Sequence, residues 1–315
     1  METYITVTFY ILGIAVFLFG TFSLGLYALI INPFLETVSI NKRLTRKQRD
    51  ILLKNFKYYR DLSGSQKIDF EKRVRNFLIH KEFIPKGIPQ VTEEMQILIA
   101  ACGVQLTFGF APVRFVSFPK ILIYPSHYLS SNGKRHKGEV SLSGFIAFSW
   151  EDFLYGYKRP EDGFNLGLHE MAHALKIEDA LHHPQEEILD HESLKEWGKI
   201  SRQELKKIKT SKTRFLRPYA FNNEDEFFAV CVEYFFEKPE EFKMQLPGLY
   251  TSLSKLLKQD PGKALQNAKF YFYPPENRKL MLLLNQAIKE LPNLKTLKAK
   301  ASFTKSLFVK GRKIS

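Results

Sequence analysis

The stretch LGLHEMAHALKIE, residues 166–178, decides how this sequence is interpreted. It puts His169 and His173 four residues apart around Glu170, inside an otherwise apolar run. Residues four apart lie on one face of an α-helix, so two imidazole nitrogens can meet at one point. Zinc binds histidine nitrogens at about 2.0–2.1 Å, and a neighbouring glutamate can take the proton of a zinc-activated water. The stretch therefore predicts a catalytic zinc site, with His169 and His173 as ligands and Glu170 as general base.

A histidine pair of this spacing also arises by chance on solvated helix faces. Here the flanking residues argue against that interpretation, because they are apolar on most sides: Leu166, Leu168, Met171, Ala172, Ala174 and Leu175. A buried helix does not turn two histidines and a glutamate inward unless something satisfies them. The apolar context therefore favours a metal ion.

A catalytic zinc needs a third protein ligand, which this stretch does not identify by itself. The extended pattern that continues with Gly and His is absent, because the chain has Lys176 and Asp179 at those positions. Acidic candidates remain at Asp179, at Glu192 and in the predicted helix over 223–237, whose first turn has Glu224, Asp225 and Glu226. That acidic turn is equally explained as a helix start, with Asn223 and Glu226 forming a capping box. Spacing alone leaves the third ligand open.

Five stretches, taken together and in order, resemble the Mlc titration factor A family of zinc-dependent peptidases over about residues 65–260. They are FLIHKEFI, ILIYPSHYL, GEVSLSGFIAFSWEDFLYG, NLGLHEMAHAL and PYAFNNEDEFFAVCVEYFFEKPEEF. The resemblance implies that Glu226 joins the two histidines as a Zn²⁺ ligand, and that Tyr219, seven residues earlier, faces the ion. A phenol aimed at the substrate oxygen would stabilise the charge that develops there. The alternative is a tyrosine that only packs at a Pro-Tyr corner.

The predicted fold class is α+β, a zincin-like metallopeptidase domain over 65–290, mostly helical with a small mixed β-sheet. Helices are predicted from helical spacing and breakers, notably over 92–107, 193–210, 223–237, 239–257, 260–268 and 276–290. Strands are predicted over 114–125 and 138–150, which are rich in β-branched and aromatic residues. The stretch GEVSLSGFIAF is either a sheet edge that binds an extended peptide or a plain core strand.

The N-terminus predicts a membrane anchor over residues 1–39. No charged residue occurs from Thr3 to Ile31, and a bilayer requires about 20 apolar residues. A basic segment follows at 40–64, predicted as a juxtamembrane helix or linker, so the positive-inside rule expects one transmembrane helix in the cell (inner) membrane with the catalytic domain cytoplasmic. This anchor departs from the soluble members that the resemblance implies.

The formal net charge of +14 implies attraction to anionic surfaces, and the tail over 291–315 is predicted to be basic and mobile, a possible contact to anionic lipid. No nucleic-acid motif is present, and the two cysteines indicate no disulfide framework. The leading hypothesis is a membrane-anchored zinc metallopeptidase that acts on a peptide or protein substrate. The alternative is a regulator that sequesters a protein partner, such as a transcriptional repressor, with little or no peptidase activity.

Overall fold

The computed structural model describes residues 20–21, 43–129, 133, 135–181, 187–210 and 215–262. Among these residues, no helix has the length and apolar character that a bilayer crossing requires. The anchor predicted over 1–39 lies outside the described residues apart from positions 20 and 21. The predicted helix over 276–290 and the tail over 291–315 lie outside them entirely. Of the helix predicted over 260–268, residues 263–268 also lie outside, and the described residues 260–262 are not helical.

Three helices open the described domain: α3 (Arg46–Asn55), α4 (Lys57–Asp61) and α5 (Gly64–Ile79). Capping boxes start two of them, with Thr45 and Gln48 at α3 and with Ser63 and Gln66 at α5. Leu52, Phe56 and Tyr59 are buried in the same hydrophobic core as the rest of the domain. Residues 43–64 belong to the segment predicted as a juxtamembrane helix or linker; they are mostly helical and contribute side chains to the domain core.

The sheet contains four strands in the order β1-β2-β6-β5. These strands are β1 (Glu82–Pro85), β2 (Lys120–Tyr124), β5 (Gly138–Ser141) and β6 (Phe145–Ser149). β2 pairs in parallel with both β1 and β6, whereas β5 pairs antiparallel to β6. A small mixed sheet is thus present, and β5 is one of its edges. A separate hairpin joins β3 (Tyr128–Leu129) to β4 (Arg135–His136).

Three details of the sheet differ from the sequence predictions. The strand expected over 114–125 spans only Lys120–Tyr124. The strand expected over 138–150 is a hairpin of two strands, because Gly144 turns the chain with a φ of 90°. β1 was not predicted at all. Its four residues follow α5 directly and pair with a strand that begins at Lys120, so neither local periodicity nor a nearby partner identifies it.

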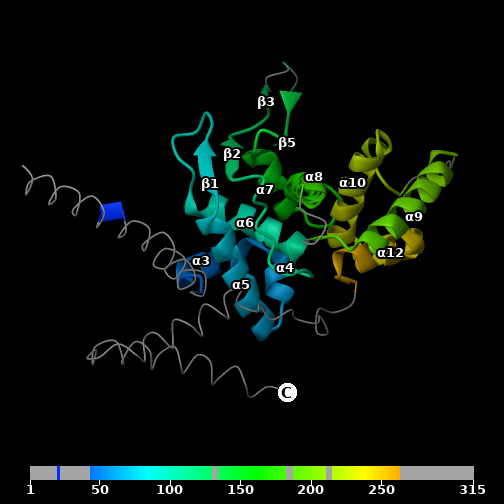
Figure 1. The fold of residues 1–315 in the computed structure, drawn as a ribbon, viewed down its shortest axis with the longest axis horizontal. Helices are drawn as coiled ribbons and strands as arrows, with labels where there is room; N and C mark the ends of the chain where they lie inside the picture. Colours follow the sequence, from blue (N-terminus) through cyan, green and yellow to red (C-terminus); the bar gives the residue numbers. More distant parts are fainter. Residues whose placement is uncertain are drawn as a thin grey trace, which may run out of the picture. The chain divides into compact units, whose positions relative to one another are not determined.

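The remaining regular elements of the described domain are helices (Figure 1). α6 (Glu93–Thr107) and α7 (Trp150–Lys158) lie before the histidine-bearing α8 (Leu166–Leu181). After it come α9 (His191–Thr210), the 3₁₀ turn η3 (Pro218–Phe221), α10 (Glu224–Glu237), α11 (Pro239–Gln245) and α12 (Pro247–Leu257). The domain is therefore mostly helical with a small mixed sheet, which confirms the coarse fold prediction.

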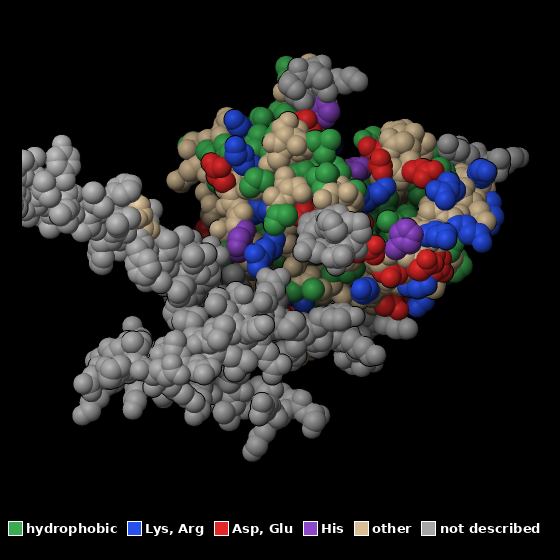
Figure 2. Space-filling view, viewed as in Figure 1, with side chains coloured by type: hydrophobic (Ala, Val, Ile, Leu, Met, Phe, Trp, Pro, Cys, Tyr) green, Lys and Arg blue, Asp and Glu red, His purple; other side chains and the backbone are tan. Residues whose placement is uncertain are grey.

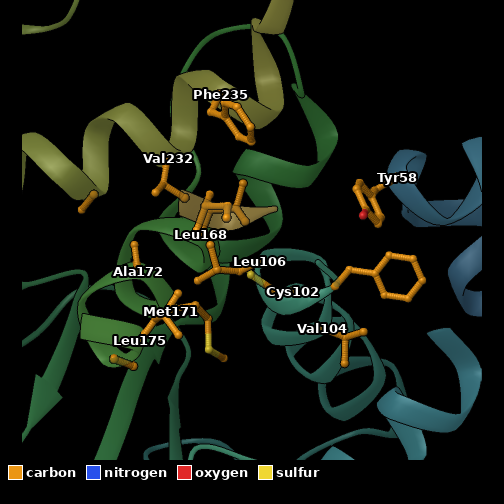
Figure 3. Close-up of a cluster of buried hydrophobic side chains, with 14 of the residues drawn as sticks. Tyr58, Cys102, Val104, Leu106, Leu168, Met171, Ala172, Leu175, Val232 and Phe235 are labelled. Atoms are coloured by element: carbon orange, nitrogen blue, oxygen red, sulfur yellow. The ribbon is translucent and has the colours of Figure 1, made fainter. Parts of the chain in front are cut away.

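The apolar side of α8 packs between α6 and α10 (Figure 3). Leu168, Met171 and Leu175 of α8 are fully buried, close to Cys102 of α6 and Val232 of α10. Burial on this side fixes which face of α8 remains for polar side chains. The core thus orients the two histidines.

The face of the protein shown in Figure 2 separates apolar from charged side chains. Hydrophobic side chains gather over the sheet, whereas acidic and basic side chains intermix over α9 and α12. The described part of this face therefore carries charge of both signs.

Candidate metal centre

Asn165 caps the start of α8 and also fixes the backbone at His169. The Asn165 side chain accepts a hydrogen bond from Leu168 N at 3.0 Å, and its carbonyl accepts one from His169 N at 2.9 Å. These bonds satisfy donors of the first turn that would otherwise have no partner. The first histidine therefore lies one turn after a well-fixed helix start.

His169 and His173 turn the same ring nitrogen toward one point. Their Nε2 atoms are 3.2 Å apart, and the Glu226 Oε2 atom lies 3.0 Å from that of His169 and 3.5 Å from that of His173. Within the described part of the chain, these three residues form the one group of histidines and acids whose potential ligand atoms all converge, within 4.8 Å of one another. The structure thus brings together the two predicted histidines and the glutamate that the resemblance implies.

Glu226 reaches this point from the first turn of α10. Asn223 caps that helix and accepts hydrogen bonds from Asp225 N and Glu226 N at 2.9 and 2.8 Å. Asn223 therefore caps α10, as the helix-start explanation predicted, yet the Glu226 side chain points to the histidines rather than back to the cap.

The other acidic candidates have different partners. Asp179 accepts hydrogen bonds from Ile188 N and Leu189 N, and it holds the segment after α8. Asp225 pairs with Lys176, and Glu192 is exposed in the first turn of α9. The group of converging ligand atoms includes none of them.

The three converging atoms, two imidazole nitrogens and one carboxylate oxygen, are all able to bind a cation. Glu226 Oε2 is buried without a well-aligned hydrogen bond, although the two imidazoles flank it. Burial alone would raise the pKa of Glu226, but the close contacts of its carboxylate with the imidazoles of His169 and His173 outweigh burial and hold that pKa well below its usual range. Two imidazole nitrogens and one carboxylate are the ligands of many catalytic zinc sites. The residues present therefore fit a zinc ion.

Glu170 lies beside this point and faces the sheet edge. Its side chain is almost completely buried, and burial raises its pKa to about 7, against the opposing effect of the two histidines. A Cβ built on Gly138 of β5 would lie 2.5 Å from Glu170 Cγ and Oε1. Only a glycine at position 138 leaves the glutamate in its present position.

Tyr219 is held on η3, where Pro218 starts the turn. Its ring centroid is 5.8 Å from that of His169, and its side chain is 48% exposed. Partial burial and the adjacent Glu226 charge raise the pKa of Tyr219 to about 12, so the phenol keeps its proton at neutral pH. The structure therefore brings Tyr219 to the ligand group, open to solvent on one side.

Sequence reasoning missed two residues at this site, Gly138 and Glu233. Glu233 Oε1 lies 2.7 Å from His169 Nδ1, on the far side of the ring from the convergence point. Glu233 follows Glu226 by seven residues, two helical turns, in a very apolar helix. An acid within such an apolar run was the one available signal, because it needs a buried partner.

Comparison with known proteins bears on this geometry. The family described as glucose-regulated metallo-peptidase M90 matches residues 36–258, more than half of the chain. The chain belongs to this family. The matched range contains all three converging residues, Glu170 and Tyr219, so this M90 metallopeptidase carries its candidate metal site inside the family region.

Curated relatives of this M90 member are similar to it at 27% identity. An uncharacterized protein of Synechocystis matches over 223 residues, which is 65% of this chain and 80% of that protein. Mlc titration factor A of Pectobacterium atrosepticum matches over 209 residues, 61% of this chain and 78% of that one. The factor of the same name from Yersinia pestis matches over 221 residues, 64% and 81% respectively.

Proposed function

We propose that this M90 member is a membrane-anchored, zinc-dependent peptidase that hydrolyses peptide bonds with Glu170 as general base. The observation that carries the proposal is the convergence of two imidazoles and one carboxylate beside a buried glutamate. When bound there, zinc supplies a Lewis acid and lowers the pKa of a coordinated water. The chain's own residues supply the remaining roles.

Glu170 accepts the proton of the attacking water and later returns it to the leaving amine. Burial raises its pKa above that of an ordinary glutamate, which favours both transfers near neutral pH. Tyr219 keeps its phenolic proton and donates a hydrogen bond to the oxygen on which negative charge develops. In this proposal Glu170 is the base and Tyr219 is the hydrogen-bond donor that peptide hydrolysis requires.

The β5 edge supports an extended peptide as the substrate. β5 pairs with β6 on one side and is the last strand in the sheet order. Its first residue, Gly138, lies against Glu170, so a peptide that adds to this edge would pass beside the base. Edge strands bind extended peptides through backbone hydrogen bonds. We therefore propose that the substrate pairs with β5.

The membrane part of the proposal rests on the uncharged apolar run from Thr3 to Ile31 and on the basic residues after it. The domain then faces the cytoplasm from the inner membrane. Its test is direct: the full chain should stay in the membrane pellet after alkaline carbonate extraction, and a variant lacking residues 1–39 should be released. Release of the full chain would contradict the anchor.

Exchange of Glu170 to Gln tests the hydrolytic role. The substitution keeps the size of the side chain but removes the base, so hydrolysis of an unstructured protein such as casein should fall by about 10² or more, with bound zinc unchanged. The control is Glu192→Gln, an exposed position in α9, which should retain full activity.

The Glu170→Gln variant and its control also distinguish a peptidase from the alternative function, a regulator that binds a protein partner. Relatives named Mlc titration factor A suggest that a protein of this family can act by binding a partner. A sequestering regulator would keep its cellular effect in the Glu170→Gln variant, whereas a peptidase would lose it. Equal turnover in the parent and in Glu170→Gln would overturn the peptidase proposal.

A further inference from the structure

Glu233 is a buried carboxylate beside the candidate metal centre, and it accepts hydrogen bonds from three different residues. It is 1% exposed, and its two oxygens accept hydrogen bonds from His169 Nδ1 at 2.7 Å and from Asn165 N at 2.6 Å. The Arg217 guanidinium donates to both oxygens, through Nη2 to Oε1 and through Nη1 to Oε2. One buried acid therefore links a candidate metal ligand to an arginine from another segment.

Arg217 belongs to the segment that carries Tyr219, two residues later. Besides Glu233, its Nη1 atom donates to Gly163 O at 2.6 Å, and its guanidinium lies 4.3 Å over the centre of the Phe164 ring. The planar fork of an arginine fixes direction as well as charge. Arg217 thus ties the start of η3 to the loop before α8 and to α10.

His169 needs an acceptor at its Nδ1 atom to be held for metal binding through Nε2, and the buried carboxylate that accepts there in turn needs a cation. An imidazole binds a metal through Nε2 only when its proton is on Nδ1, and a carboxylate that accepts from Nδ1 fixes both that tautomer and the ring plane. A carboxylate buried as deeply as Glu233 is costly unless a cation pairs with it. Arg217 provides that cation without occupying the ligand position.

We propose that Arg217 and Glu233 act together as a positioning pair, which orients His169 for the metal and holds the Tyr219 segment against the same centre. Neither residue touches the substrate in this assignment. The His169 half concerns metal binding alone, whereas the Tyr219 half rests on the proposed peptidase function.

The chain offers a matched control for Glu233. Glu237 lies one turn further along α10, is also buried, and accepts from Gly163 N and Asn165 Nδ2 at 3.0 Å each. It anchors the same loop, but through Gly163 and Asn165 rather than through His169 or Arg217. Burial raises the pKa of Glu237 to about 8, so a neutral glutamine is a close mimic at that position.

The first measurement is zinc affinity of the full chain, in competition with a chromophoric chelator. Glu233→Gln should weaken zinc binding by about 10- to 100-fold. Glu237→Gln should change it less than twofold while causing a similar or smaller loss of thermal stability. Equal effects of the two substitutions would overturn the assignment, because they would show only a general loosening of α10.

Arg217→Gln should weaken zinc binding in the same direction, by about tenfold. Its control is Arg73→Gln, another buried arginine, which donates to Phe108 O and Phe110 O and should leave zinc affinity unchanged. In the double variant of Arg217 and Glu233, the second substitution should add less than about twofold. Fully additive losses would overturn the proposal, since they would mean that Arg217 does not act through Glu233.

A spectroscopic measurement separates orientation from affinity. With Co²⁺ in place of zinc, the visible absorption of the loaded full chain should shift in Arg217→Gln and remain at the parental position in Arg73→Gln. An unshifted spectrum in Arg217→Gln would count against the orienting role.

The Tyr219 half is tested by turnover of casein in variants saturated with zinc. Arg217→Gln should lower kcat, and in a Tyr219→Phe background it should lower kcat by a much smaller factor. A full loss in both backgrounds would overturn this half. If no variant, nor the parent, cleaves casein, the peptidase proposal fails, while the zinc and cobalt measurements still decide the His169 half.

Discussion

At the scale of single residues, Gly138 decides where Glu170, the proposed general base, lies. A methyl group at this position would lie 2.5 Å from the Glu170 side chain, so Gly138→Ala should push the carboxylate away from the ligand group. We expect kcat to fall about tenfold or more, because small displacements of a catalytic group are costly. The metal content should be unchanged, since neither histidine is touched.

Gly64→Ala is the matched control for this prediction, because nothing lies within 4 Å of a Cβ built there. It should retain parental turnover and stability. Parental turnover in Gly138→Ala as well would show that Glu170 has room to move without consequence.

Tyr219 is predicted to stabilise charge on the substrate oxygen. Tyr219→Phe keeps the ring, which packs 5.8 Å from His169, and removes only the hydroxyl. Loss of one such donor typically costs about 10²–10³ in kcat, with little effect on KM. Steady-state kinetics at full zinc occupancy measure this split. An unchanged kcat would favour the packing role instead.

The extent to which sequence predicts the site differs from residue to residue. His169 and His173 share one helix, so their spacing alone brings them together. Spacing alone did not identify Glu226 as the third ligand or Tyr219 as the residue that faces the ion. Both assignments followed from the family resemblance. Gly138 and Glu233 were not predicted, because their roles depend on contacts between elements 32 and 64 residues apart in the chain. No local pattern records such contacts.

At the scale of elements, Asn165 both caps α8 and ties it to α10. Asn165→Ala removes the bond to Leu168 N and the bond to Glu237, so it should lower the free energy of unfolding by about 2 kcal/mol. It should also weaken zinc binding, because the start of α8 positions His169. Chemical denaturation and chelator competition measure the two effects.

Thr92→Ala provides the comparison, since Thr92 caps α6 through Met95 N and belongs to no part of the metal centre. It should cost about 1 kcal/mol of stability without changing zinc affinity. A loss of zinc affinity of the same size in both variants would contradict a local role for Asn165.

The elements themselves were predictable where capping residues and apolar periodicity agree. The ranges expected for α6, α9 and α10 match the structure within two residues. The sheet was harder, because β1 has only four residues, and because the turn at Gly144 divides one apolar stretch into two strands. Strand identity is set by partners distant in sequence, which local reasoning does not contain.

At the scale of the whole molecule, the turn at Phe115–Ser117 joins the sheet to α8 and α5. Glu178 of α8 accepts hydrogen bonds from Val116 N and Ser117 N, just before β2. Lys81, after α5, donates to the adjacent carbonyl of Phe115 at 2.6 Å. The histidine-bearing helix α8 is therefore linked through this turn to both the sheet and the N-terminal helices, so stability should respond to the charge of Lys81.

Burial lowers the pKa of Lys81 to about 8 despite the opposing charge of Glu178, whereas the unfolded chain has the ordinary value near 10.5. Between these values the unfolded state binds more protons, so the free energy of unfolding should rise with pH across that window. The rise between pH 8 and 9.5 should be about 1.5 kcal/mol. Lys81→Met cannot titrate, so the difference between parent and variant isolates this contribution from the tyrosines. Urea denaturation at several pH values measures it. A parent-minus-variant difference that stays flat, or falls, from pH 8 to 9.5 would mean that Lys81 remains charged in the folded protein.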